Sequence, residues 1–165
     1  GIEPLFNNIP VYDIEGIDNY IWIGSRSGLF VFNKINPQIR QAKDIGRKDF
    51  PEMMVRITAI KEYDGVIFVA GEMGIAKFRL DTQEWNLVYP STLYHGNTVY
   101  SMAVNRKFLF LGTKDGLVRI NKKTGFYRDY SYDFIGQVND IKLDGNVVWL
   151  GTSRGLIKFK WKGDS

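Results

Sequence analysis

The chain has no cysteine and only one histidine, His95, in its 165 residues. Without cysteine it can form neither a disulfide framework nor a thiolate metal site, and it has no cysteine nucleophile. A single histidine excludes a histidine-rich metal site and a pair of histidines acting as acid and base. The patterns H-E-x-x-H, G-x-S-x-G and the P-loop are also absent. The sequence therefore predicts a protein that is not an enzyme and that carries no cofactor or metal ion.

Long apolar runs and clusters of like charge are lacking as well. No apolar run approaches the roughly 20 residues that a membrane-spanning helix needs, so membrane insertion is not expected. The net charge is +4, but the basic residues are scattered along the chain. The densest group, residues 121–123, is typical of a solvated turn. This charge pattern indicates an ordinary protein surface, and we expect no nucleic-acid partner.

What the sequence does contain is a pattern that occurs four times. An aromatic residue is followed two positions later by a small residue and, four positions after that, by glycine. The aromatic residues are Trp22, Phe68, Phe110 and Trp149. The glycines are Gly28, Gly74, Gly116 and Gly155. A period near 40 residues occurs in propellers and in helical solenoids, but short runs of Val, Ile, Phe, Tyr and Trp broken by Gly, Asn and Asp are typical of strands.

Each of the four units predicts a blade of four antiparallel strands. The glycine takes a positive φ and closes a tight hairpin, an apolar strand precedes this hairpin, and a more polar strand follows it. The units cover approximately residues 11–45, 55–89, 98–131 and 136–162. The expected fold is therefore an all-β β-propeller with four blades. The aromatic residues at equivalent positions are interpreted as packing between blades.

The sequence leaves two arrangements of the blades open. Residues 2–9 could supply the outer strand that the fourth unit lacks, which would close a four-bladed ring in a single domain. Alternatively, the chain is a segment of a larger propeller, or a half-ring that associates with a second copy. Self-association through open edges is expected in the second case, because an unpaired sheet edge recruits another chain.

Two of the units resemble a known repeat. Trp22-Ile23-Gly24-Ser25 and Trp149-Leu150-Gly151-Thr152, each followed by x-x-Gly-Leu, resemble the two-component regulator propeller repeat of bacterial sensor proteins. Ala70 in the second unit departs from the pattern. The resemblance implies a non-enzymatic module for sensing or ligand recognition in a larger bacterial protein, in an extracytoplasmic or periplasmic location. A protein–protein interaction or assembly scaffold is the alternative, and a propeller lyase or a glycan-binding domain is a minor one.

The predicted binding surface is the face that carries the inter-blade loops and the tips of the central hairpins. The loops cover residues 46–54, 90–97 and 132–135 and contain aromatic and methionine side chains, which are enriched at interaction surfaces. The candidate binding residues are Arg26, Phe50, Met53, Glu72, Tyr94, His95, Lys114, Asp115, Phe134 and Arg154. Three of the four tips carry a cation, which favours an anionic or polar partner. A small-ligand sensor predicts a concave pocket on this face, whereas a scaffold predicts a flatter one.

Overall fold

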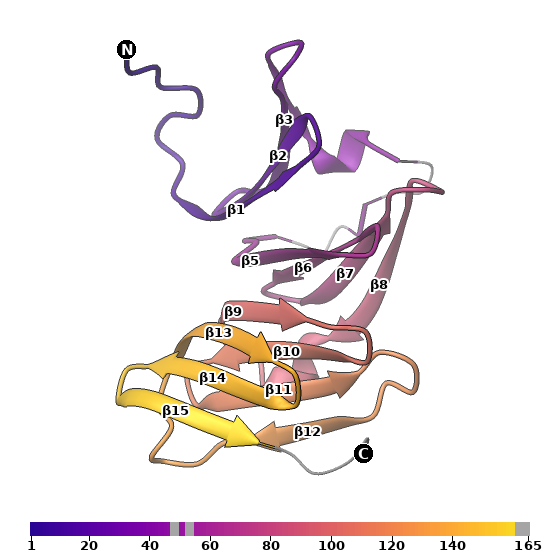
Figure 1. Cartoon of the computed structure of the whole chain (residues 1–165). Coiled ribbons are helices and arrows are strands. Elements are labelled where there is room, and N and C mark those ends of the chain that lie inside the picture. The colour runs from indigo at the N-terminus through magenta and orange to yellow at the C-terminus, as the bar shows by residue number, and fades with distance from the viewer. Residues whose placement is uncertain (47–49, 52–54, 161–165) are drawn as a thin grey trace.

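The computed structural model of the chain describes residues 1–46, 50–51 and 55–160, and these residues form four antiparallel sheets (Figure 1). We call the sheets blades 1 to 4. Blade 1 consists of β1 (Val11–Ile17), β2 (Tyr20–Ser25), β3 (Gly28–Asn33) and β4 (Gln38–Gln41). Blade 2 consists of β5 (Ala59–Tyr63), β6 (Val66–Gly71), β7 (Gly74–Arg79) and β8 (Glu84–Pro90). Blade 3 consists of β9 (Val99–Val104), β10 (Phe108–Thr113), β11 (Gly116–Asn121) and β12 (Tyr127–Tyr130). Blade 4 consists of β13 (Val138–Asp144), β14 (Val147–Thr152) and β15 (Gly155–Lys160).

Helical structure is limited to two short 3-10 helices among the described residues, η1 (Ala42–Asp44) after blade 1 and η2 (Ser91–Tyr94) after blade 2. Neither is long and apolar enough to cross a membrane. Within each blade every strand pairs with its neighbour in the sequence. The predicted all-β architecture of antiparallel sheets is therefore confirmed.

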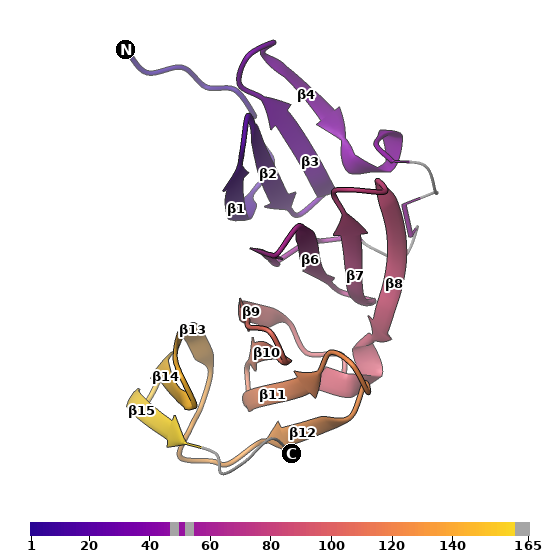
Figure 2. The same cartoon turned by 45° about the vertical axis from the view of Figure 1, so that its right-hand side comes forward.

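The blades follow one another in a C-shaped arc (Figure 2). The first strands of successive blades lie side by side, so that β1 contacts β5, β5 contacts β9, and β9 contacts β13. Blades 1 and 4 lie at the two ends of the arc (Figure 2). This order is propeller-like, and the ends of the arc do not meet.

The N-terminal residues differ from the expected closing strand. Residues 2–6 form no strand, and Phe6 instead packs edge-on against Phe30 of blade 1, with ring centroids 4.8 Å apart. The physical reason is distance, because these residues lie beside blade 1 while β15 lies at the other end of the arc (Figure 2). Among the described residues β15 therefore has no fourth strand as a partner.

The central hairpin of each blade is closed by the glycine of the repeat. In blade 1, Ser25 pairs in register with Gly28, which has a φ of 115° that favours glycine. The Ser25 hydroxyl donates a hydrogen bond to the Gly28 carbonyl over 2.8 Å. Thr113 and Thr152 repeat this bond in blades 3 and 4, at 3.2 and 3.1 Å, whereas blade 2 has Gly71 at this position. The repeat thus encodes a hydroxyl-clamped turn in three blades.

The repeated aromatic residues lie between blades, as the repeat predicts, in three of the four units. Trp22, Phe68 and Phe110 are buried in the clusters that join each blade to the next. Trp149 lies on the outward side of blade 4 and is only half-buried, with the Lys158 ammonium 5.6 Å from its ring centroid. Among the described residues no further blade packs against this side of blade 4.

Polar side chains also link neighbouring blades. Asp13 of blade 1 accepts a hydrogen bond from the Ile60 backbone N–H of blade 2 over 2.8 Å, and burial raises the pKa of its carboxyl. Lys122, expected in a solvated turn, instead lies with its ammonium 4.3 Å from the ring centroid of Tyr63. This contact places Lys122 between blades 2 and 3, where desolvation lowers the pKa of its ammonium group.

Candidate functional site

A cleft lies between blades 3 and 4 on the face that carries the inter-blade loops and hairpin tips. Its volume is about 770 Å³. Four candidate residues line it: His95 follows η2, Lys114 and Asp115 form the tip between β10 and β11, and Arg154 lies at the tip between β14 and β15. Side chains from loops far apart in the sequence therefore converge on one concave surface.

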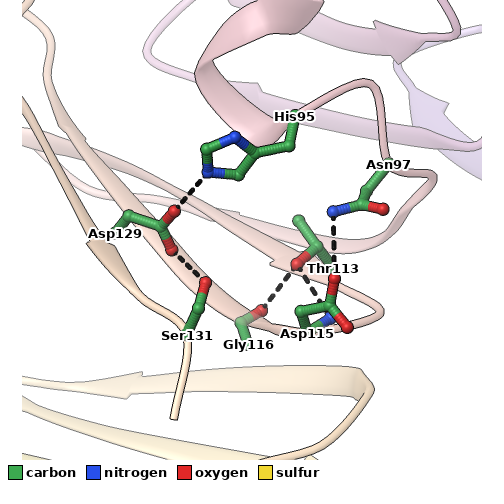
Figure 3. Close-up of polar contacts among 7 residues, drawn as sticks. All are labelled: His95, Asn97, Thr113, Asp115, Gly116, Asp129 and Ser131. Carbon is green, nitrogen blue, oxygen red and sulfur yellow. Dashed lines mark hydrogen bonds and ion pairs between the residues drawn. The ribbon is translucent and has the colours of Figure 1, made fainter.

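A network of hydrogen bonds holds the polar groups of the cleft (Figure 3). His95 Nε2 lies 2.7 Å from Asp129 Oδ2, and Ser131 donates its hydroxyl hydrogen to the other oxygen of Asp129. Asn97 donates from Nδ2 to Asp115 Oδ2 over 3.3 Å. These bonds fix the loop after η2 against blade 3, so that His95 has a defined position although its side chain is exposed.

The order of the groups matters for chemistry. A serine nucleophile needs a histidine in contact with its hydroxyl, with the carboxylate behind the histidine. Here Asp129 lies between Ser131 and His95, and each of its oxygens is bound to one of them. The arrangement orients the imidazole and does not activate the hydroxyl, so it can present polar groups to a ligand but lacks the geometry of acyl transfer.

The cleft carries charges of both signs. Lys114 and Arg154 provide cationic donors from two neighbouring blades, and Asp115 and Asp133 provide carboxylate acceptors. Within residues 1–46, 50–51 and 55–160 no group of three or more histidine, aspartate or glutamate side chains could hold a metal ion. Such a lining suits a small polar ligand that offers both an anionic group and hydrogen-bond donors.

Four other candidate residues lie outside this cleft. Arg26 and Glu72 are exposed at the tips of blades 1 and 2. Phe134 is exposed in the loop before blade 4, where Tyr132 stacks on it with ring centroids 5.4 Å apart. Phe50 packs edge-on against Trp85 and lines a separate cleft of about 320 Å³. Met53, also a candidate, is outside the residues that the structure describes.

Tyr94 differs from the expectation that it lies on the binding surface. Its side chain is fully buried in the cluster between blades 2 and 3, and its hydroxyl donates a hydrogen bond to the Gly71 carbonyl over 2.9 Å. The η2 helix turns this side chain inward while the next residue, His95, has a left-handed backbone with a φ of 55° and points outward. Tyr94 therefore belongs to the core.

The buried phenol of Tyr94 predicts that stability declines at alkaline pH. Desolvation raises its pKa above the ordinary value of 10.0. Above pH 10 the folded state thus retains a proton that the unfolded state releases, so stability is expected to fall as the pH rises through this range. Tyr94→Phe should lower the free energy of unfolding at pH 8 by about 0.5–1.5 kcal/mol through the lost hydrogen bond. It should also reduce the decline between pH 10 and 11, measured by urea denaturation.

The matched control for this prediction is Tyr127→Phe, because Tyr127 is an exposed tyrosine in β12. This variant is expected to keep both the stability at pH 8 and the alkaline decline. An equal alkaline decline in the Tyr94→Phe variant and the wild type would show that other groups cause it.

Sequence reasoning missed part of the cleft. Asp129, Ser131 and Gln137 line it but were not predicted, and Asp133 lies in the predicted loop 132–135 without having been named as a candidate. The signal that could have found them is position, since they lie directly before or within the loop that leads from blade 3 to blade 4. A second cleft of about 510 Å³ between blades 1 and 2, lined by polar groups including Arg40 and Asp44, was also missed.

Comparison with known proteins gives similarity at the level of fold. No family model and no curated protein matches the sequence. The computationally designed Ika4 protein is 15% identical, with a TM-score of 0.69, and the match covers 91% of this chain and 90% of that one. The extracellular domain of a putative hybrid two component system from B. thetaiotaomicron is 18% identical, with a TM-score of 0.74, over 96% of this chain and 22% of that chain.

BamB from Moraxella catarrhalis is 14% identical, with a TM-score of 0.60, over 92% of this chain and 44% of that chain. This chain thus spans nearly all of the designed protein but less than half of the two natural ones. Together with its four antiparallel sheets in an arc, these matches show that the chain has an all-β, propeller-like fold, similar to that of extracellular domains of two-component systems.

Proposed function

We propose that this protein is a non-enzymatic propeller-type module that binds a small polar ligand in the cleft between blades 3 and 4. In this proposal it is the ligand-recognition domain of a larger extracytoplasmic sensor protein. The observation that carries the proposal is the concave cleft, in which His95, Lys114, Asp115 and Arg154 converge from separate loops. A pre-formed concave site with a few convergent polar groups is the usual form of a small-molecule site.

Two further observations support the sensor role. The repeat sequences resemble the two-component regulator propeller repeat, and the fold is similar to that of an extracellular domain of a putative hybrid two component system. The cleft lies between two blades, so a ligand bound there contacts both. Binding would therefore restrict the movement of blade 4 relative to blade 3, and this change would signal to another domain that the site is occupied.

The cationic tips are the testable part of the site. Lys114→Ala and Arg154→Ala are each expected to weaken ligand binding about 10-fold or more, because a hydrogen bond to a charged group contributes about 1.5–3 kcal/mol. The measurement is a titration of the isotope-labelled protein, followed by amide NMR, with a panel of amino acids, dicarboxylates, sugar acids and neutral sugars. Shifts are expected at residues 95, 114–115, 131–137 and 153–154.

The matched control is Arg26→Ala, because Arg26 occupies the equivalent hairpin tip of blade 1 and does not line the cleft. This variant should bind as the wild type does. The proposal is wrong if no compound of the panel shifts these amides. It is also wrong if the Lys114→Ala and Arg154→Ala variants bind a compound as tightly as the wild type does.

A second candidate function, an assembly scaffold, is favoured by a different observation. Apolar side chains on the outward sides of blades 1 and 4 remain exposed, including Ile14 and Leu156. Exposed apolar side chains that gather on one face mark interaction sites.

A further inference from the structure

Every contact between two blades has two halves. We call the side of a blade that faces the following blade its forward face, and the side that faces the preceding blade its backward face. The residue after the repeat glycine lies on the forward face, and this residue is Leu29, Ile75, Leu117 or Leu156 in blades 1 to 4. The first three are buried, Leu117 to 0% exposure, whereas Leu156 is 75% exposed. Within the part of the chain that the structure describes, no other blade covers Leu156 on the forward face of blade 4.

The backward face of blade 1 is open at its first strand, although Phe6 covers part of the face. Ile14, Ile60, Met102 and Ile141 occupy equivalent positions on the first strands of the four blades. Ile60 is fully buried, and Met102 and Ile141 are buried too, but Ile14 is 61% exposed. Strand register places further apolar residues on the same side as Ile14, and these are Ile21, Ile23, Phe30, Phe32 and Ile39. Phe6 covers Phe30 but leaves Ile14 exposed.

The forward face of blade 4 carries Trp149 and Leu156 at the positions of Phe110 and Leu117 in blade 3, together with charged side chains. Lys158 pairs in register with Trp149, as Arg119 pairs with Phe110 in blade 3. Arg119 is buried between blades 3 and 4, where its guanidinium lies 4.6 Å from the ring centroid of Phe108. A cation at this position is therefore compatible with burial between blades.

The small residue of the repeat marks where the next blade approaches. A Cβ atom added at Gly24 or Gly112 would lie 2.9 Å from the Ile57 carbonyl oxygen or 2.7 Å from that of Val138, each at the start of the following blade. At Gly151 the nearest atom is the Asp140 Cβ of the same blade, at 3.8 Å. Blade 4 therefore retains the glycine of a blade contact, although no blade among the described residues lies against Gly151.

We infer that the forward face of blade 4 docks on the backward face of blade 1 of a second copy of this chain. The same contact formed twice, about a twofold axis, joins two arcs into a closed ring of eight blades. The second copy is the occupant because this chain itself carries both halves of the missing contact, and each half repeats residues that already pack in the three contacts within the chain. Blades 1 and 4 lie at opposite ends of the arc, so a single chain does not bring its own two faces together (Figure 2).

Light scattering over a concentration series from about 1 to about 100 µM tests this inference. This range detects a dimer whose Kd lies in the micromolar range. The wild type is expected to reach twice the chain mass of 19.0 kDa. Ile14→Asp and Leu156→Asp should each weaken the dimer at least about 100-fold, because each places a carboxylate in an apolar contact that occurs twice. Both side chains are exposed in the single chain, so both variants should keep the wild-type circular dichroism spectrum.

Matched controls are Ile35→Asp and Phe126→Asp, at exposed apolar residues in the turns between β3 and β4 and between β11 and β12. These variants should dimerise as the wild type does. A wild type that stays monomeric throughout the series, or a dimer that both face variants leave intact, overturns the inference. Open-ended oligomers of increasing mass overturn the closed ring of two copies.

A cross-linking experiment separates two copies from closure within one chain. Because the chain has no cysteine, the variant Ile14→Cys/Leu156→Cys carries the only two thiols for a bismaleimide reagent. The expected product is a covalent dimer. A cross-link within one chain shows that the arc closes on itself and overturns the inference, as does the absence of any cross-link.

Discussion

Leu117→Ala is expected to lower the free energy of unfolding by about 2–5 kcal/mol, whereas Leu156→Ala should change it by less than about 0.5 kcal/mol. The two leucines occupy the same position of the repeat, next to the glycine that closes the central hairpin. Leu117 is enclosed by blade 4, while Leu156 extends into solvent in the single chain. Truncation therefore leaves a cavity at the first position and none at the second.

The measurement is urea denaturation followed by circular dichroism, with both substitutions made in the Ile14→Asp background so that self-association does not contribute. Both double variants are compared with the Ile14→Asp single variant. The difference between their losses of unfolding free energy therefore measures how much a neighbouring blade stabilises this position. Equal losses at both positions would mean that Leu156 is buried in the monomer and that the arc closes within one chain.

The hairpins could be predicted from the sequence because the forces that form them are local. A serine or threonine three residues before a glycine determines both the turn and the side-chain hydrogen bond that closes it, as Ser25 and Gly28 show. The order of the blades follows from the repetition of this unit. Antiparallel strands that are neighbours in the sequence pair with each other, so the register could be deduced without long-range information.

The parts that could not be predicted depend on contacts across many residues. Nothing local distinguishes Tyr94 from His95, yet the 3-10 turn buries the first and exposes the second. Lys122 lies in a polar turn, and only the neighbouring blade supplies the aromatic ring over which it packs. Whether residues 2–6 can pair with the last blade depends on where that blade lies. The curvature of the whole arc determines its position.

In the candidate site, too, the locally determined features could be predicted and the long-range contacts could not. The hairpin tips could be assigned to one face from the repeat alone, and Lys114, Asp115 and Arg154 do line the cleft. Asp129 was missed because its partner, His95, is 34 positions away in the sequence. A pairing of this kind becomes visible only when η2 and β12 are brought together by the packing of blades 2 and 3.

The proposed ligand site and the proposed assembly can be tested separately. The cleft lies between blades 3 and 4 of one chain, and the docking faces lie on the outward sides of blades 1 and 4. A monomeric variant such as Ile14→Asp should therefore still bind a ligand in the cleft. A dimer should form equally well in the Lys114→Ala variant, because Lys114 lies at a tip of blade 3.

Gly112→Ala is expected to lower the free energy of unfolding by about 2–4 kcal/mol, through overpacking and a lost hydrogen bond. The added methyl group would collide with the Ser101 hydroxyl and would lie 2.7 Å from the Val138 carbonyl oxygen. Ser101 now donates a hydrogen bond to that carbonyl over 2.9 Å, so the collision breaks a link between blades 3 and 4.

Gly151→Ala, at the equivalent position of blade 4, should change the stability of the Ile14→Asp monomer by less than about 0.5 kcal/mol, because the nearest atom to its added methyl group is at 3.8 Å. Urea denaturation of both variants in that background measures the contrast. If both substitutions destabilise the monomer equally, the strand itself requires the glycine. The close approach of a following blade is then not the reason for the requirement. If only Gly112→Ala destabilises the monomer, the repeat keeps a small residue to make room for the neighbouring blade that packs against blade 3 at Gly112.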